Sequence, residues 1–229
     1  MRMQVLGIIG MLLSVFLLPF IGNEKVDGLY TEPYPEEQIA TLSERLDVSS
    51  INTEPVRKGI HCMSVDAAER IAIGTSAGEQ KQISVYNSKM EFLFAISFKA
   101  HGSFSIVLSE DTVWAFLWRS NLCVGFSSDG TVKEVLDVPK SRGNIEYLEQ
   151  AVRRDPQIVN GNTYALQNQI RALDLTGEFS RVIVTYEDGE QTVLYDVENM
   201  MMASLILKQI GLCLLIALTI GCVCIFKKQ

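Results

Sequence analysis

ISVYNSKMEFLFAI (83–96), LCVGFSSDGTVKEVL (122–136) and IRALDLTGEFSRVIV (170–184) follow one pattern. In each, an alternating apolar run precedes a short polar turn and a second apolar run, and a period of two is typical of half-buried strands. Aligning the turns brings Met90, Gly130 and Gly177 to one position. Glycine accepts the positive φ that tight hairpins need, so Met90 predicts a different turn in the first copy. The pattern therefore predicts three repeated hairpins.

Alternating runs fill the region 60–197 and predict an all-β domain, because β-branched and aromatic residues favour half-buried strands. The predicted strands are Ile60–Val65, Arg70–Thr75, Gln82–Tyr86, Glu91–Ser97, Phe104–Leu108, Thr112–Trp118, Leu122–Phe126, Val132–Val138, Thr163–Leu166, Gln169–Leu173, Phe179–Tyr186 and Gln191–Val197. One interval among them, Ile145–Arg154, has helical spacing of its apolar residues and predicts a short helix.

The aligned turns lie about 40 and 47 residues apart, which with four strands per unit is the spacing of β-propeller blades. On this pattern, the region 60–197 resembles the blade repeats of bacterial β-propellers of the quinoprotein-like or NHL-like kind. The resemblance implies about three propeller-like four-stranded units. A closed ring has roughly 4–8 blades, so two arrangements are open. Two chains complete a six-bladed ring, or the strands form an irregular β-sandwich or sheet stack whose ends are covered by helices at 36–46 and 145–154.

Two uncharged apolar stretches flank this domain, Val5–Gly22 and Gln209–Phe226. About 20 apolar residues cross a bilayer as a helix, so residues 1–22 are predicted to be a transmembrane helix or signal anchor. A cleaved secretory signal is the alternative for this segment, although Phe20 stands where cleavage favours a small residue. Residues 203–226 are predicted to form a second transmembrane helix, followed by a tail at 227–229.

Basic residues set the expected orientation. Arg2 precedes the first apolar stretch, and Lys227 and Lys228 follow the second. Since basic residues beside membrane helices stay on the cytoplasmic side, we expect both termini in the cytoplasm and an extracytoplasmic domain at the cell membrane. The domain spans residues 60–199. A polar, Pro-containing linker at 23–59 precedes it, with a short helix predicted at Glu36–Leu46.

Composition and motifs exclude several functions. The net charge is −7, with 20 basic and 27 acidic side chains, so no nucleic-acid partner is expected. The two histidines, His61 and His101, belong to no metal-ligand motif, and no metal or cofactor is predicted. No nucleophile with a recognisable base partner is present. The sequence therefore favours a protein that is not an enzyme.

Candidate binding residues form an aromatic stripe, since Trp114, Phe116 and Trp118 fall on one face of a predicted strand. Exposed, the stripe would stack on a sugar or a peptide; packed between sheets, it would be core. Cys62 and Cys123 form the one domain pair that a disulfide could join in an oxidising compartment, although they occupy different positions in successive units. S-acylation is the candidate modification for two membrane-edge cysteines, Cys222 and Cys224.

The sequence thus predicts a membrane-anchored extracytoplasmic binding or scaffolding protein. Its expected partners are the membrane and either another protein or a second copy that completes the β assembly. The recognised molecule would be an envelope protein, a peptide or a glycan. Two alternatives are open: an enzyme, a hydrolase or lyase with a site assembled across blades, and a component of an envelope sensing complex.

Overall fold

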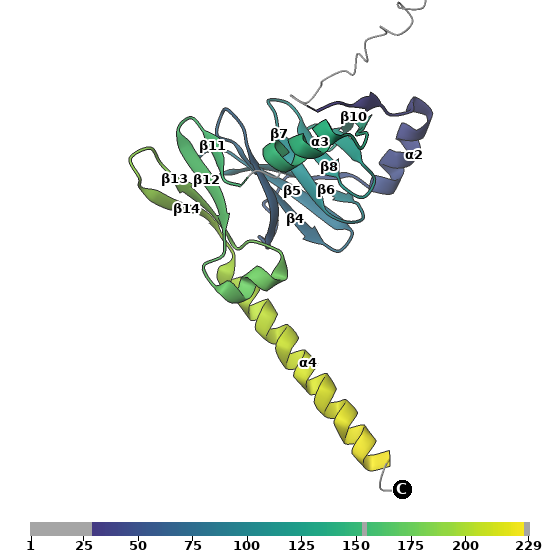
Figure 1. The fold of residues 1–229 in the computed structure, drawn as a ribbon, viewed down its shortest axis with the longest axis vertical. Helices are drawn as coiled ribbons and strands as arrows, with labels where there is room; N and C mark the ends of the chain where they lie inside the picture. The colour runs from purple at the N-terminus through teal and green to yellow at the C-terminus, as the bar shows by residue number, and fades with distance from the viewer. Residues whose placement is uncertain (1–28, 153–154, 227–229) are drawn as a thin grey trace, which may run out of the picture.

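The structure is a computed structural model that describes residues 29–152 and 155–226. Three antiparallel sheets form the domain, and a long helix leaves it at one end (Figure 1). The transmembrane helix or signal anchor predicted at 1–22, the first residues of the linker and the tail at 227–229 lie outside the described residues.

Sheet I is the first along the chain. Its strands in spatial order are β2 (Ser49–Ile51), β6 (Phe92–Lys99), β5 (Gln80–Tyr86), β4 (Ile71–Ala77) and β3 (Ile60–Val65). Strands β3 to β6 pair in chain order, and β2 from the linker is added beside β6. Four of the predicted strands thus form one meander, as a repeated unit requires.

Sheets II and III repeat this meander. The order in sheet II is β1 (Glu32–Pro33), β10 (Val132–Asp137), β9 (Leu122–Phe126), β8 (Val113–Leu117) and β7 (Phe104–Leu108). The order in sheet III is β11 (Gln157–Val159), β12 (Asn162–Gln167), β13 (Arg181–Thr185) and β14 (Gln191–Asp196). The prediction of three β units is therefore confirmed at the level of three antiparallel sheets.

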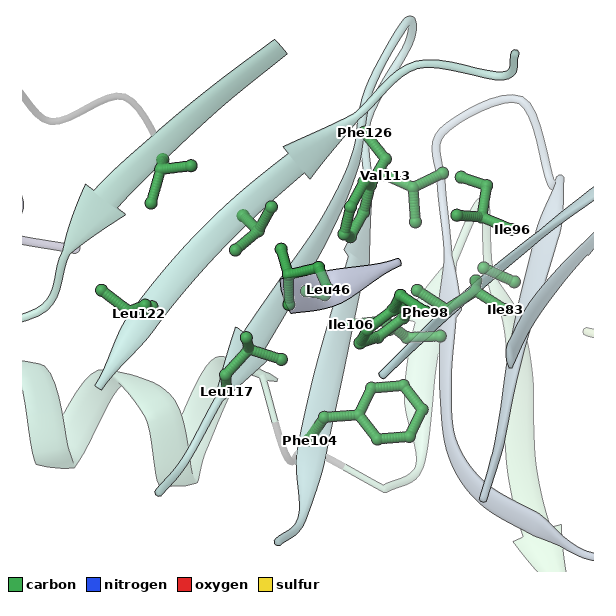
Figure 2. Packing of buried hydrophobic residues seen from close by; sticks show 14 of the residues in the cluster. Leu46, Ile83, Ile96, Phe98, Phe104, Ile106, Val113, Leu117, Leu122 and Phe126 are labelled. Atoms are coloured by element: carbon green, nitrogen blue, oxygen red, sulfur yellow. The ribbon is translucent and has the colours of Figure 1, made fainter. Parts of the chain in front are cut away.

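The order of the three sheets in space differs from their order along the chain, because sheet I is the middle layer. One apolar cluster joins sheet I to sheet III through Met63, Ile73, Val182 and Tyr195. A second cluster joins sheet I to sheet II, and Figure 2 shows Leu46 pointing into it near Ile106 and Phe126. Residues of a third cluster cover the opposite face of sheet II. Sheet I therefore buries apolar side chains on both of its faces.

Helices cover sheet II and the cluster beside it. The helix predicted at 36–46 is confirmed as α2 (Glu36–Leu46), which buries Leu42 and Leu46 in the cluster between sheets I and II. Helix α3 (Arg142–Tyr147) and the π-helix η1 (Leu148–Val152) form the helical segment predicted at 145–154. Leu148 and Val152 pack on the outer face of sheet II. The stack of sheets is thus closed by helices at the sheet II end, and a ring completed by two chains stays a prediction.

Three hairpin turns share one geometry. In the turns that begin at Asn87, Ser127 and Tyr186, the first residue's N–H bonds the carbonyl four residues later, and the fourth residue's N–H bonds the first carbonyl. The fourth residue has a positive φ in each: 61° at Met90, 85° at Gly130 and 85° at Gly189. The expectation of a different turn at Met90 was wrong, because methionine adopts the left-handed conformation there.

The third repeat was aligned incorrectly. Its hairpin turn contains Gly189, whereas Gly177 ends the 3₁₀-helix η2 (Arg171–Thr176). The strand predicted at Gln169–Leu173 is therefore wrong. Leu173 has no solvent exposure and packs beneath sheet III. An apolar residue buried between polar ones is also what a strand shows in sequence, and this is why the segment was predicted to be a strand.

The C-terminal helix α4 (Glu198–Phe226) begins directly after β14 and starts earlier than the predicted residue 203. Among the described residues, the segment Glu198–Ile216 is long and apolar enough to cross a membrane, and only 6% of its apolar window is buried in the domain. Its large apolar side chains are exposed at Met200 and again from Ile206 and Leu207 onward.

Replacing Gly130 by alanine is expected to destabilise the domain more than replacing Gly189. Both residues have a φ of 85°, which costs a residue with a Cβ atom about 1–2 kcal/mol. At Gly130 the added Cβ would also lie 3.0 Å from the Ser50 nitrogen of β2, whereas at Gly189 the space is open. The measurement is urea unfolding of both variants in the same detergent, followed by tryptophan fluorescence. Equal losses would contradict the packing of β2 on this turn.

Candidate functional site

A cleft of about 450 Å³ lies between α2 and the loops that end sheets I and II. Its volume falls within the ~300–1,000 Å³ of small-ligand sites. Leu42, Leu117 and Leu122 contribute apolar surface. The charged or titratable side chains on its walls are Tyr34, Arg45, Glu79, Lys99, His101, Arg119 and Asp137.

Local structure brings these walls together. Arg45 belongs to the last turn of α2, which Asp47 ends with a φ of 47°. The loop after β6 turns at Gly102, with a φ of 80°, and a Cβ atom there would lie 3.2 Å from the Cβ of Arg119. The loop is tied to the β8–β9 connection by a bond from the Trp118 N–H to the Ser103 carbonyl, 3.2 Å long. Glycine thus permits the close approach that forms one side of the cleft.

Two basic side chains of the cleft, Lys99 and His101, are paired within the protein. The Lys99 ammonium lies 2.8 Å from Asp47, and this hydrogen bond with its charge attraction raises the pKa of Lys99. The His101 Nδ1 lies 3.1 Å from the Glu79 carboxylate. Both pairs are exposed, so they contribute little to stability.

Arg45 and Arg119 differ from Lys99 and His101 in their pairing. Within residues 29–152 and 155–226, neither guanidinium forms an ion pair. A guanidinium offers five N–H donors in a fixed plane, the geometry that suits carboxylate and phosphate. In the part of the chain that the structure describes, the cleft thus offers two guanidinium groups without a carboxylate partner to an anionic group.

Of the three residues in the predicted aromatic stripe, two are buried and one is partly exposed. Trp114 and Phe116 are 8% and 2% exposed and pack in the cluster beneath α3 and η1. Trp118 is half-buried, donates from Nε1 to the Ser105 hydroxyl at 2.9 Å, and lines an apolar cavity of about 250 Å³. One of the three aromatic side chains is therefore accessible, Trp118 in the turn after β8, instead of a stripe of three.

A third cavity, also about 250 Å³, lies near the first strands of the three sheets and includes His61, Ser105, Asp155 and Gln157 in its lining. The Gln157 amide accepts from the Val65 N–H and donates to the Met63 carbonyl. Asp155 accepts from the Leu166 N–H, and partial burial raises its pKa. His61 stacks on Phe104 with ring centres 5.4 Å apart. Most of these polar groups thus hold the sheets together.

The cysteines of the domain are free thiols. Cys62 packs beside the cluster between sheets I and II, whereas Cys123 lies in the cluster on the opposite face of sheet II. Burial raises the pKa of both thiols. The disulfide considered for this pair is not formed, because sheet II separates the two clusters. Cys222 and Cys224 lie within α4, and their acylation stays a prediction.

Lys81 is buried beside Cys62, with 3% of its surface exposed. Its ammonium donates to the Ser76 hydroxyl and the Gly78 carbonyl, each at 2.7 Å, and lies 5.9 Å from the Phe104 ring centre. No carboxylate forms an ion pair with it in the described part of the chain. Burial lowers its pKa, because the charged form is poorly solvated.

Comparison with known proteins does not assign the chain to a family. No protein-family model and no curated protein matches the chain. Two solved structures of virginiamycin B lyase from Staphylococcus aureus are similar to it, a catalytically inactive variant with quinupristin and a selenomethionine-substituted form. They are 13% and 12% identical, with TM-scores of 0.27 and 0.26 over 66% of this chain. The chain spans 45% of each, and at these TM-scores its function rests on its own residues.

The stability contributed by Lys81 is expected to rise with pH. At pH values between the lowered pKa of Lys81 in the folded chain and its ordinary pKa of 10.5, Lys81 is protonated in the unfolded chain and has released its proton in the folded chain. Because the unfolded state then binds more protons, the free energy of unfolding increases with pH. The measurement is unfolding of the wild type and Lys81→Met from pH 7 to 10; their difference removes the titration of tyrosines and cysteines.

The matched control is Lys89→Met, in the exposed turn between β5 and β6. It accounts for the loss of a lysine charge as such. A difference between wild type and Lys81→Met that stays constant or falls with pH would contradict the prediction.

Proposed function

We propose that this chain is a membrane-anchored binding protein whose cleft beside α2 takes an acidic segment of a partner protein. The observation that carries the proposal is that Arg45 and Arg119 face one cleft of about 450 Å³ without a carboxylate partner in the described chain. The chain as a whole carries a net charge of −7, so this local pair of cations is not a consequence of a basic composition.

An acidic peptide fits the cleft on two counts. Charge-assisted hydrogen bonds from guanidinium to carboxylate are roughly twice as strong as neutral ones. The apolar surface of Leu42, Leu117 and Leu122 accepts an aliphatic side chain next to the carboxylate. The adjoining cavity at Trp118, about 250 Å³, is large enough for one further apolar side chain. Buried apolar anchors of this kind carry most of the energy in protein interfaces.

Anchoring by α4 and the arrangement of the sheets belong to the same proposal. The segment Glu198–Ile216 is apolar and protrudes from the domain, which supports insertion in a membrane. Lys227 and Lys228 at its far end favour a cytoplasmic tail and an extracytoplasmic domain. The three meanders resemble the blades of a propeller. Strand β3, the first meander strand of sheet I, contacts β7 of sheet II and β11 of sheet III, which are the first strands of their own meanders. A role in envelope sensing would run through the bound partner.

An enzyme with a site among the three sheets is the second candidate. The cavity lined by His61, Ser105 and Asp155 supports it, because a hydrolase or lyase needs polar groups that converge. The hydrogen bonds that occupy Ser105 and Gln157 favour a structural role for this cavity. The binding cleft has the stronger support because its two arginines are uncommitted.

Binding of an acidic peptide tests the proposal. The probe is a fluorescein-labelled peptide of alternating glutamate and leucine, added to the full chain in nanodiscs at low ionic strength. Arg45→Gln and Arg119→Gln are each expected to weaken binding about tenfold, because each removes a charge-assisted hydrogen bond worth about 1.5 kcal/mol. Fluorescence anisotropy measures the affinity, which is also expected to fall as salt is added.

Arg142→Gln is the matched control, since Arg142 is an exposed arginine outside the cleft that pairs with Glu146. A peptide with lysine in place of glutamate controls for apolar adsorption. Unchanged affinity in the double variant Arg45→Gln/Arg119→Gln, or an equal loss in Arg142→Gln, would overturn the proposed function.

A further inference from the structure

The loop formed by η2 and the residues after it exposes apolar side chains that nothing in the domain covers. Leu175 is 91% exposed, the highest value among the large apolar side chains of the described domain, and Ile170 is 38% exposed. Leu173, between them, has no exposure and fixes the loop to the core. Leu175 therefore projects from a segment that is firmly attached.

This loop lies beside the first turns of α4. The Ile170 N–H donates to the buried Glu198 carboxylate at 2.9 Å, and Glu198 is the first residue of the helix. Leu173 packs in the same cluster as Met201, with Leu205 against it. In Figure 1 the loop, in green, lies at the end of the domain from which α4 leaves. The loop and the helix thus share one end of the molecule.

The loop packs along α4 as far as Leu205, which lies against the apolar cluster that contains Leu173. Lys208 is ten residues beyond Glu198, or about 15 Å along a helix. It is also the last charged residue before the uncharged stretch Gln209–Phe226. A lysine at such a boundary places its ammonium at the headgroup level of a membrane.

More apolar and basic side chains lie near the start of α4. Val56 is 75% exposed and Met200 is 41% exposed, and both line a shallow cavity beside the first helical turn together with Arg57, Asp196 and Glu198. Arg171 begins η2 and is exposed. Apolar side chains next to basic ones are the composition of surfaces that lie in a membrane interface, with burial to about 5–10 Å.

We infer that the η2 loop docks in the membrane interface beside α4, with Leu175 inserted at the boundary between lipid headgroups and acyl chains. The occupant is the bilayer that holds α4, because the loop packs on this helix at Met201 and Leu205, within one helical turn of Lys208 and the uncharged stretch after it. The inference rests on the anchoring in the proposed function and is independent of the peptide cleft. A second contact beside the helix fixes the tilt of the domain over the membrane.

Site-directed fluorescence measures the depth of Leu175. In a background with Cys62, Cys213, Cys222 and Cys224 replaced by serine, Cys123 stays unlabelled because it is buried. A single NBD label is placed by Leu175→Cys in the full chain, in nanodiscs of phosphatidylcholine and phosphatidylglycerol. Quenching by iodide reports water, and quenching by nitroxide-labelled lipid reports the membrane.

Two further positions make the result decisive. Ile158→Cys lies in β11 and is 59% exposed in the domain, and Leu214→Cys lies in α4. The inference predicts that the label at 175 is quenched several-fold less by iodide than the label at 158, and is quenched by the lipid nitroxide. A shielded label at 214 with a label at 175 as exposed as that at 158 would overturn the docking and leave the anchoring intact. Iodide access to the label at 214 would overturn both.

Discussion

Burial of sheet I on both faces is the constraint on which the rest of the structure depends. Along β4, Ile71 and Ile73 enter the cluster shared with sheet III, whereas Ala72 between them enters the cluster shared with sheet II. A sheet with two apolar faces requires a layer on each side. Sheets II and III supply those layers, and the helical segment at Arg142–Val152 then covers the outer face of sheet II. The layer order follows from this burial, although it differs from the order of the units along the chain.

The spacing of apolar residues along the chain predicted the strands and the helix whose formation depends on that spacing. Strands β3 to β10 of sheets I and II were predicted because their apolar residues alternate, and α2 was predicted from Ile39, Leu42 and Leu46 on one face. The strands that were missed, β1, β2 and β11, have two or three residues each and exist through pairing with a neighbouring strand. The strand prediction at 169–173 was wrong because a 3₁₀-helix that buries Leu173 spaces its apolar residues much as a strand does.

The candidate site could not be predicted from the sequence, for a physical reason. Arg45 ends a helix in the linker, and Arg119 lies in a turn of sheet II; the packing of α2 between sheets I and II brings both to one cleft. Neither residue lies in a motif, and what distinguishes them is the lack of a carboxylate partner in the described chain. The histidines drew attention in the sequence, yet His101 pairs with Glu79 and His61 stacks on Phe104.

The junction between domain and helix determines how anchoring affects the cleft. Arg181 of β13 lies 2.9 Å from Asp196 and 2.8 Å from Glu198, and Glu198, 4% exposed, also accepts from the backbone of Ile170. The Arg181–Glu198 pair is partly buried, and together with the hydrogen bond to Ile170 it ties the first turn of α4 to the domain. In the proposed anchoring, the orientation of α4 in the membrane would therefore set the direction in which the cleft and its two arginines face.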